Sequence, residues 1–316
     1  MRAPVTLDLH LPDFDLPDTP PERLFERLVE IGGTAEESGF TSITVMDHLH
    51  QIASYGPPTN RMLEGNTILA ALAGRTSRAS LGLLVGGVTY RNPALLAKIT
   101  TTIDVISRGR AVLGLGAAWF EAEHDAYGFA FPPLRERFER LEDALRIARA
   151  MFTQPESSVA GVHHSTTGAL NVPQPLRGDI PILVGGSGER KTLRLVAQYA
   201  DGCNFAGDVE RIRHLLGVLD RHCDDVGRDP REITRTRIGA LFIAPTHEQA
   251  QRKFDAAGMA PDRATAVALV GDPDGIGEQT QALIEAGMQG LTLSIPDVHD
   301  LETVALAGRT LAPLLG

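Results

Sequence analysis

A histidine and a carboxylate that directly follow an apolar segment are the first candidates for proton chemistry in this chain. In SITVMDHLHQI, Asp47 and His48 come at the end of a run predicted as a strand over residues 42–46. Histidine can transfer protons near neutral pH, and an adjacent carboxylate can fix its tautomer or hold the edge of a cofactor. Position alone is equally compatible with a turn-capping aspartate beside an ordinary loop histidine.

Two glycine-containing segments follow other predicted strands. Gly86 and Gly87 interrupt the strand pattern of LGLLVGGVTYRNP, which is typical of a bulge or of a flat ligand against the backbone, although a plain turn gives the same pattern. GLGAAW places Gly116 before the only tryptophan, Trp119, which predicts room for a planar group beside an aromatic wall. Burial of that tryptophan in the core is the alternative. The segment lacks the third glycine of a dinucleotide-binding fingerprint.

A third glycine-rich segment, ILVGGSGERK, joins a predicted strand to a helix predicted to begin near Glu189. Backbone N–H groups at the start of a helix favour an anion. We therefore expect a cofactor phosphate to bind at this loop, with a ligand-free turn as the alternative. The loop consists of Gly185, Gly186, Ser187 and Gly188.

Composition excludes several other classes of function. Of the 316 residues, 43% are hydrophobic and 22% are charged, as in globular proteins. The 40 acidic residues outnumber the 30 Lys and Arg residues, giving a net charge of −10 without a basic block, so we expect no nucleic-acid partner. No apolar run approaches the roughly 20 residues that span a bilayer, so we expect no membrane association and a cytoplasmic location. Two cysteines predict neither a disulfide framework nor a metal site, and redox chemistry would need a cofactor.

The elements that must position these residues alternate between short β-branched runs and amphipathic stretches. This pattern predicts an α/β fold, a (β/α)8 TIM barrel with insertions, formed by residues 1–316 as a single domain. Asn66, Asn92 and Asp208 are expected to cap helices. Functional loops of such a barrel follow the C-terminal ends of its strands. The eight strands are predicted over residues 6–11, 42–46, 80–85, 111–115, 180–184, 202–205, 236–243 and 291–294.

Three stretches are too long for simple connections, and we interpret them as insertions. They cover residues 48–65, 157–178 and 246–273. The first matters most because it directly follows the strand that ends before Asp47. The second is expected to form a small β-hairpin.

Several of these segments together resemble the luciferase-like monooxygenase superfamily over most of residues 5–245. They are VMDHL, LGLLVGGVTYRNPALLAK, GAAWFEAEHDAYG and ILVGGSGERKTLRLVAQYADGCN. YRNPALLAK and GAAWFEAEHDAYG are most similar to the actinobacterial branch of oxidoreductases that use the deazaflavin coenzyme F420. The resemblance implies a barrel that holds a flavin or deazaflavin ring at the C-terminal ends of its strands.

The resemblance also implies particular site residues. It places a non-prolyl cis peptide at or next to Leu84-Val85 and puts Asp47 and His48 in the active site. F420-dependent sugar-phosphate dehydrogenases carry a glutamate where this chain has Trp119, with Glu121 two residues on, which leaves the substrate open. The candidate catalytic residues are thus His48, Asp47, Trp119 and Glu121. The candidate cofactor-binding residues are Leu84, Val85, Gly86, Gly87, Gly116, Gly185, Gly186, Ser187, Gly188, Ala206 and Gly207.

The resulting hypothesis is an F420-dependent oxidoreductase that transfers a hydride between the deazaflavin and a small organic substrate, with His48 moving a proton. Two alternatives stay open: an FMN-dependent monooxygenase of the same fold, which would need a flavin reductase as a partner, and a non-catalytic flavin-binding barrel. A homodimer is also left open.

Overall fold

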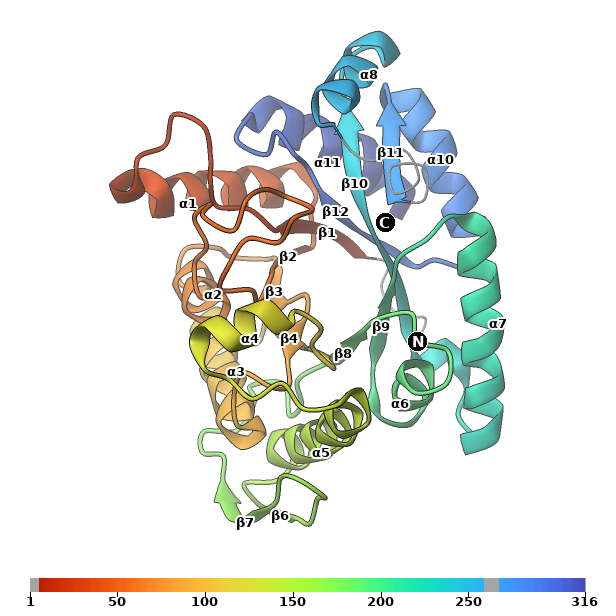
Figure 1. The fold of residues 1–316 in the computed structure, drawn as a ribbon. Helices are drawn as coiled ribbons and strands as arrows, with labels where there is room; N and C mark the ends of the chain where they lie inside the picture. The colour runs from red at the N-terminus through yellow and green to blue at the C-terminus, as the bar shows by residue number, and fades with distance from the viewer. Residues whose placement is uncertain (1–5, 259–266, 316) are drawn as a thin grey trace.

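A computed structural model describes residues 6–258 and 267–315. Within them, eight parallel strands form a closed barrel with helices around it (Figure 1). Pairing of the first strand with the last, with Leu7 opposite Leu291, closes the ring. The barrel strands are β1 (Thr6–Leu11), β2 (Ser42–Val45), β3 (Ser80–Leu83), β5 (Ala111–Gly116), β8 (Ile182–Gly185), β9 (Gly202–Phe205), β10 (Thr234–Ile243) and β12 (Gly290–Ser294). The predicted fold class and all eight predicted strands are confirmed, with ends that differ from the prediction by at most two residues.

The helices lie outside the strands and cover them. Asn92 and Asp208 cap helices as predicted, and the Asn92 Oδ1 atom accepts a hydrogen bond from the N–H of Ala94 at 3.0 Å. The prediction for Asn66 is wrong, because the helix already begins at Gly65 and the Glu64 carboxylate caps it. The helices are α1 (Pro21–Ser38), α2 (Gly65–Ala73), α3 (Pro93–Ser107), α4 (Glu121–Tyr127), α5 (Leu134–Thr153), α6 (Thr192–Tyr199), α7 (Val209–Val226), α8 (His247–Ala256), α10 (Pro273–Glu285) and α11 (Leu301–Leu315), with a 3-10 turn at Pro230–Glu232.

The insertions take different forms. The second contains the expected hairpin, made of β6 (Glu156–Val159) and β7 (Thr166–Leu170), which projects beyond α5 (Figure 1). The third contains α8 and a short strand, β11 (Ala268–Gly271), that pairs with the outer half of β10. No helix in the described residues is both long enough and apolar enough to cross a membrane.

Strand alternation divides the barrel into an apolar outer layer and a polar interior. Leu7 and Leu9 of β1 belong to the hydrophobic core, whereas the alternate residues Asp8 and His10 form hydrogen bonds with Thr44 of β2. The Thr44 hydroxyl donates to Asp8 and lies 3.0 Å from His10 Nδ1. Burial raises the pKa of Asp8 to about 6 and lowers that of His10 to about 3. Both side chains are therefore neutral or close to it at mildly acidic pH.

Candidate active site

The wall of the site is built where β3 is interrupted. The peptide bond between Leu84 and Val85 is cis, which confirms the position that the resemblance implied. The chain then pairs again as β4 (Gly86–Gly87), with Gly87 opposite Gly116 of β5. The predicted bulge is thus present, and it turns the Val85 side chain toward β5 and β8.

The packing of the Val85 side chain explains why positions 116 and 185 are glycine. A Cβ atom on Gly116 would lie 2.8 Å from one Val85 methyl carbon, and a Cβ atom on Gly185 would lie 2.9 Å from both. Such distances are too short for real side chains, so these strands must carry glycine for Val85 to pack between them. We expected glycine at 116 to make room for a planar group directly. Instead it makes room for Val85, which itself lines the cavity.

A cavity of about 480 Å³ lies at this end of the barrel, and we call it the ring pocket. The structure brings twelve of the sequence-predicted residues together there, namely Asp47, His48, Leu84, Val85, Gly86, Gly87, Gly116, Trp119, Gly185, Gly186, Ser187 and Gly188.

Three predicted residues do not line the ring pocket. Glu121 is exposed at the start of α4. Ala206 lines a neighbouring cavity. The Gly207 carbonyl accepts a hydrogen bond from Arg237 at 3.1 Å.

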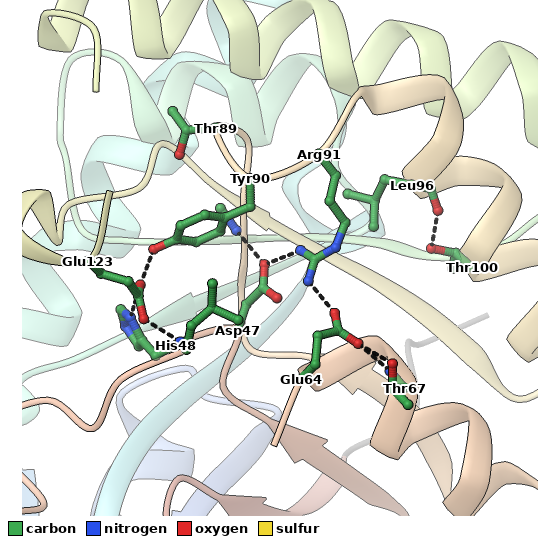
Figure 2. A network of polar contacts seen from close by, with 12 residues as sticks. Asp47, His48, Glu64, Thr67, Thr89, Tyr90, Arg91, Leu96, Thr100 and Glu123 are labelled. Atoms are coloured by element: carbon green, nitrogen blue, oxygen red, sulfur yellow. Dashed lines mark hydrogen bonds and ion pairs between the residues drawn. The ribbon is translucent and has the colours of Figure 1, made fainter. Parts of the chain in front are cut away.

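The carboxylate that contacts His48 is Glu123, which the sequence interpretation missed. His48 Nδ1 lies 3.1 Å from Glu123 Oε2, and the same carboxylate accepts hydrogen bonds from the Tyr90 hydroxyl and from the N–H groups of Leu49 and His50 (Figure 2). Burial favours the neutral acid, but the hydrogen bonds outweigh it and hold the pKa of Glu123 at about 2. Burial and the hydrogen bond to Glu123 raise the pKa of Tyr90, so its hydroxyl remains a donor.

This arrangement fixes the tautomer of His48. An ionised carboxylate only accepts hydrogen bonds, so the nitrogen that faces Glu123 must carry a hydrogen. The second nitrogen, Nε2, is then the one able to take up a proton. Because the His48 side chain lines the ring pocket, it offers that chemistry to a ligand there.

Asp47 forms hydrogen bonds with the bulge after β3 rather than with His48. Its Oδ2 atom accepts hydrogen bonds from the Gly87 N–H at 3.1 Å and from Arg91 at 2.8 Å, and Arg91 also pairs with Glu64, the cap of α2 (Figure 2). Burial is the largest influence on Asp47 and raises its pKa despite the nearby arginine. The network therefore ties the bulge after β3 to the start of α2.

An aromatic pair borders His48. The Trp119 ring meets the His48 ring edge-on with 5.4 Å between centroids and stacks against Phe120 at 5.2 Å. Trp119 is 61% exposed, which rules out the alternative that it belongs to the core. Its side chain lines the ring pocket, and its role as an aromatic wall for a ligand stays a prediction.

The loop after β8 differs from the prediction in where its helix begins. Helix α6 starts at Thr192 rather than near Glu189, because residues 190 and 191 still form a turn. The Gly186 N–H donates to the Asn204 carbonyl at 3.2 Å. The N–H groups of Ser187 and Gly188, by contrast, make no hydrogen bond within the described residues.

The same loop borders a second, more open cavity of about 760 Å³, which we call the basic groove. It shares Ser187 and Gly188 with the ring pocket. Four basic side chains and one acidic side chain line it: Arg135, Arg190, Lys191, Arg211 and Glu189. An anionic group that leaves the ring pocket past this loop would meet these positive charges.

Comparisons with known proteins show which family this chain belongs to. Residues 9–265 match the family model described as luciferase-like monooxygenase. The chain is 35% identical to an F420-dependent glucose-6-phosphate dehydrogenase of Rhodococcus hoagii (strain 103S), over 91% of this chain and 93% of that protein.

Solved structures extend the similarity of fold. The coenzyme F420 dependent tetrahydromethanopterin reductase from Methanopyrus kandleri superposes with a TM-score of 0.77 at 20% identity, covering 99% of this chain and 100% of that one. The oxygenating constituent of 3,6-diketocamphane monooxygenase from Pseudomonas putida, in complex with FMN, gives 0.75 at 19% identity over 98% of both chains. At these identities the likeness concerns the fold.

Proposed function

The chain belongs to the luciferase-like monooxygenase family, and on that premise we propose that it is an oxidoreductase that uses coenzyme F420 to transfer a hydride to or from a small organic substrate. The observation that carries the proposal is the ring pocket. Val85 and His48 line the same cavity, and Glu123 fixes the tautomer of His48. Relatives that are 30% and 35% identical over 91% of this chain are named F420-dependent, which supports F420 over FMN.

The residues fit a planar cofactor with an anionic tail. Leu84, Val85 and the adjoining glycines would support the ring, since glycine backbone leaves a flat surface. The N–H groups of Ser187 and Gly188, followed by the basic groove, would hold the phosphate-bearing tail. When bound, the deazaflavin supplies a carbon that gives or accepts a hydride together with its two electrons.

The side chains of the protein supply orientation and proton transfer. His48 Nε2 would take the hydroxyl proton of an alcohol or return a proton to a carbonyl oxygen. Glu123 would hold the imidazole in the required tautomer, and Trp119 would shield that side of the pocket from water.

Turnover with each cofactor tests this proposal against the FMN alternative. The purified chain is mixed with F420 and a panel of alcohols, and in parallel with FMN, a flavin reductase and oxygen. We expect reduction of F420 by an alcohol without a second protein and without oxygen. Turnover that occurs only with FMN, reductase and oxygen would assign a monooxygenase, and absence of turnover under both conditions would favour a non-catalytic binding protein.

A further inference from the structure

The ring pocket adjoins a third cavity, on a part of its lining separate from the basic groove. This cavity of about 430 Å³ lies among the connection after β1 and the C-terminal parts of β10 and β12, and we call it the apolar cavity. It shares Tyr55 and Ile238 with the ring pocket. It has no lining residue in common with the basic groove among the described residues.

The lining of the apolar cavity suits an uncharged ligand. Hydrocarbon side chains make up most of it, including Leu16, Ile238, Phe242, Val267 and Ile295. No lysine or arginine is among its described lining residues. The hydroxyls of Tyr55 and Ser294, 3.2 Å apart, provide a polar spot where the cavity meets the ring pocket.

Besides a tyrosine, the titratable groups that line the cavity are His299 and two carboxylates, and both carboxylates have partners of their own. Asp15 pairs with Arg61 at 2.7 Å. Asp13 accepts hydrogen bonds from the Gln51 amide at 3.1 Å and from the Asp15 N–H at 3.0 Å. A phosphate group placed here would be desolvated beside a carboxylate, without a lysine or arginine among the described lining residues, which is unfavourable.

We propose, building on the function proposed above, that the apolar cavity is the substrate chamber and that it takes an uncharged, largely apolar alcohol or ketone. The basic groove would receive the anionic tail of the cofactor, and the apolar cavity is a second space that adjoins the ring pocket, at Tyr55 and Ile238. The chain would then differ in substrate from the relatives named glucose-6-phosphate dehydrogenases.

The reaction balances with groups already named. An alcohol that extends past Tyr55 would give up its carbinol hydrogen as a hydride, for which bound F420 would supply the acceptor of the hydride and its two electrons. The hydroxyl proton would go to His48 Nε2 as the carbon–oxygen double bond of the ketone forms. Reduction of a ketone would be the same step in reverse, with reduced F420 supplying the hydride and His48 Nε2 returning the proton.

Binding of cyclohexanone and of glucose 6-phosphate, followed by ligand-detected NMR, tests the proposal on the unmodified chain with and without F420. We expect cyclohexanone to bind and glucose 6-phosphate to give no signal. Binding of glucose 6-phosphate in place of cyclohexanone would overturn the proposal, and so would failure of cyclohexanone to bind.

A cavity-filling variant locates the binding. Ala240 lines the apolar cavity but not the ring pocket, so Ala240→Phe should weaken cyclohexanone binding by about tenfold or more while F420 affinity stays within about twofold. Ala71→Phe makes the same change at an exposed position of α2 and should leave both unchanged. Unchanged cyclohexanone binding in a folded Ala240→Phe protein would contradict the assignment. If the chain bound cyclohexanone but not F420, the proposed function would be wrong, while the assignment of the apolar cavity as the binding site for cyclohexanone would still hold.

Discussion

His48 and Glu123 are hydrogen-bonded to each other, and the direction of that hydrogen bond decides which nitrogen of His48 is free to accept a proton. Glu123 is ionised and can only accept, so it keeps the hydrogen on Nδ1. An amide in its place could donate to that nitrogen and so stabilise the opposite tautomer. Replacing the carboxylate by an amide therefore tests whether Glu123 positions the hydrogen on His48 or only stabilises the surrounding structure.

We predict that Glu123→Gln lowers the turnover rate about 100-fold at saturating F420, because the wrong tautomer leaves no acceptor on Nε2. The dissociation constant for F420 should change little, since the amide oxygen can still accept from the N–H groups of Leu49 and His50. Tyr90→Phe is the matched control, since it removes one donor to the same carboxylate and leaves the tautomer alone. Equal losses of turnover in both variants would show that Glu123 acts only through loop structure.

The low pKa of Glu123 also makes folding stability depend on pH. Its pKa is about 2 in the folded protein against 4.5 for an ordinary glutamate, so ionised Glu123 stabilises the fold fully above about pH 4.5 and progressively less as the pH falls toward 2. Urea unfolding of the parent and Glu123→Gln should therefore differ more at pH 7 than at pH 3. A difference that stays constant with pH would show that the folded protein does not favour the ionised form.

At the scale of secondary-structure elements, the strands follow from sequence because short apolar runs alternate along the chain with amphipathic stretches. The run over residues 202–205 is a strand with the predicted ends. The meeting of Glu123 with His48 was not predictable in the same way. EAEHDAY contains two glutamates two positions apart, which a helix turns to nearly opposite sides, and only the packing of α4 against the loop after β2 selects Glu123. Arg91 and Glu64 likewise meet only through the fold.

The loop after β8 carries the next prediction. Gly186 has a φ of +122°, so any substitution there strains the backbone and obscures an effect of charge. Ser187→Asp instead places a negative charge at the loop and should weaken F420 binding by about tenfold or more. Asparagine has nearly the same size as aspartate but carries no charge, so Ser187→Asn should keep the dissociation constant for F420 within about threefold of the parent value. If both variants bind F420 like the parent in a fluorescence titration, the phosphate does not lie at this loop.

The packing of Val85 between glycines carries a prediction about stability. Gly185→Ala places a Cβ atom 2.9 Å from both Val85 methyls and should destabilise the protein by about 1–3 kcal/mol. Gly33→Ala within α1 is the control, since its Cβ meets nothing within 4 Å and alanine favours a helix by up to about 1 kcal/mol. Urea unfolding measures both. Equal stability of the two variants would mean that the niche around Val85 does not require glycine.

On the scale of the whole molecule, barrel closure brings together residues from distant parts of the sequence. Pairing of β1 with β12 joins the two ends of the chain, and it places Ser294 beside Tyr55 from the first insertion. The apolar cavity depends on this closure and could not be predicted from sequence, because its walls combine residues that follow β1 with residues of β10 and β12. The expectation of a single domain over residues 1–316 stays a prediction.

Equilibrium titration of the purified chain with F420 and with FMN tests the proposed function most directly. The ring pocket with its basic groove should bind F420 with a dissociation constant at least about tenfold lower than that for FMN, a difference of about 1.4 kcal/mol. Tighter binding of FMN, or no binding of F420, would contradict the assignment of this chain as an F420-dependent oxidoreductase.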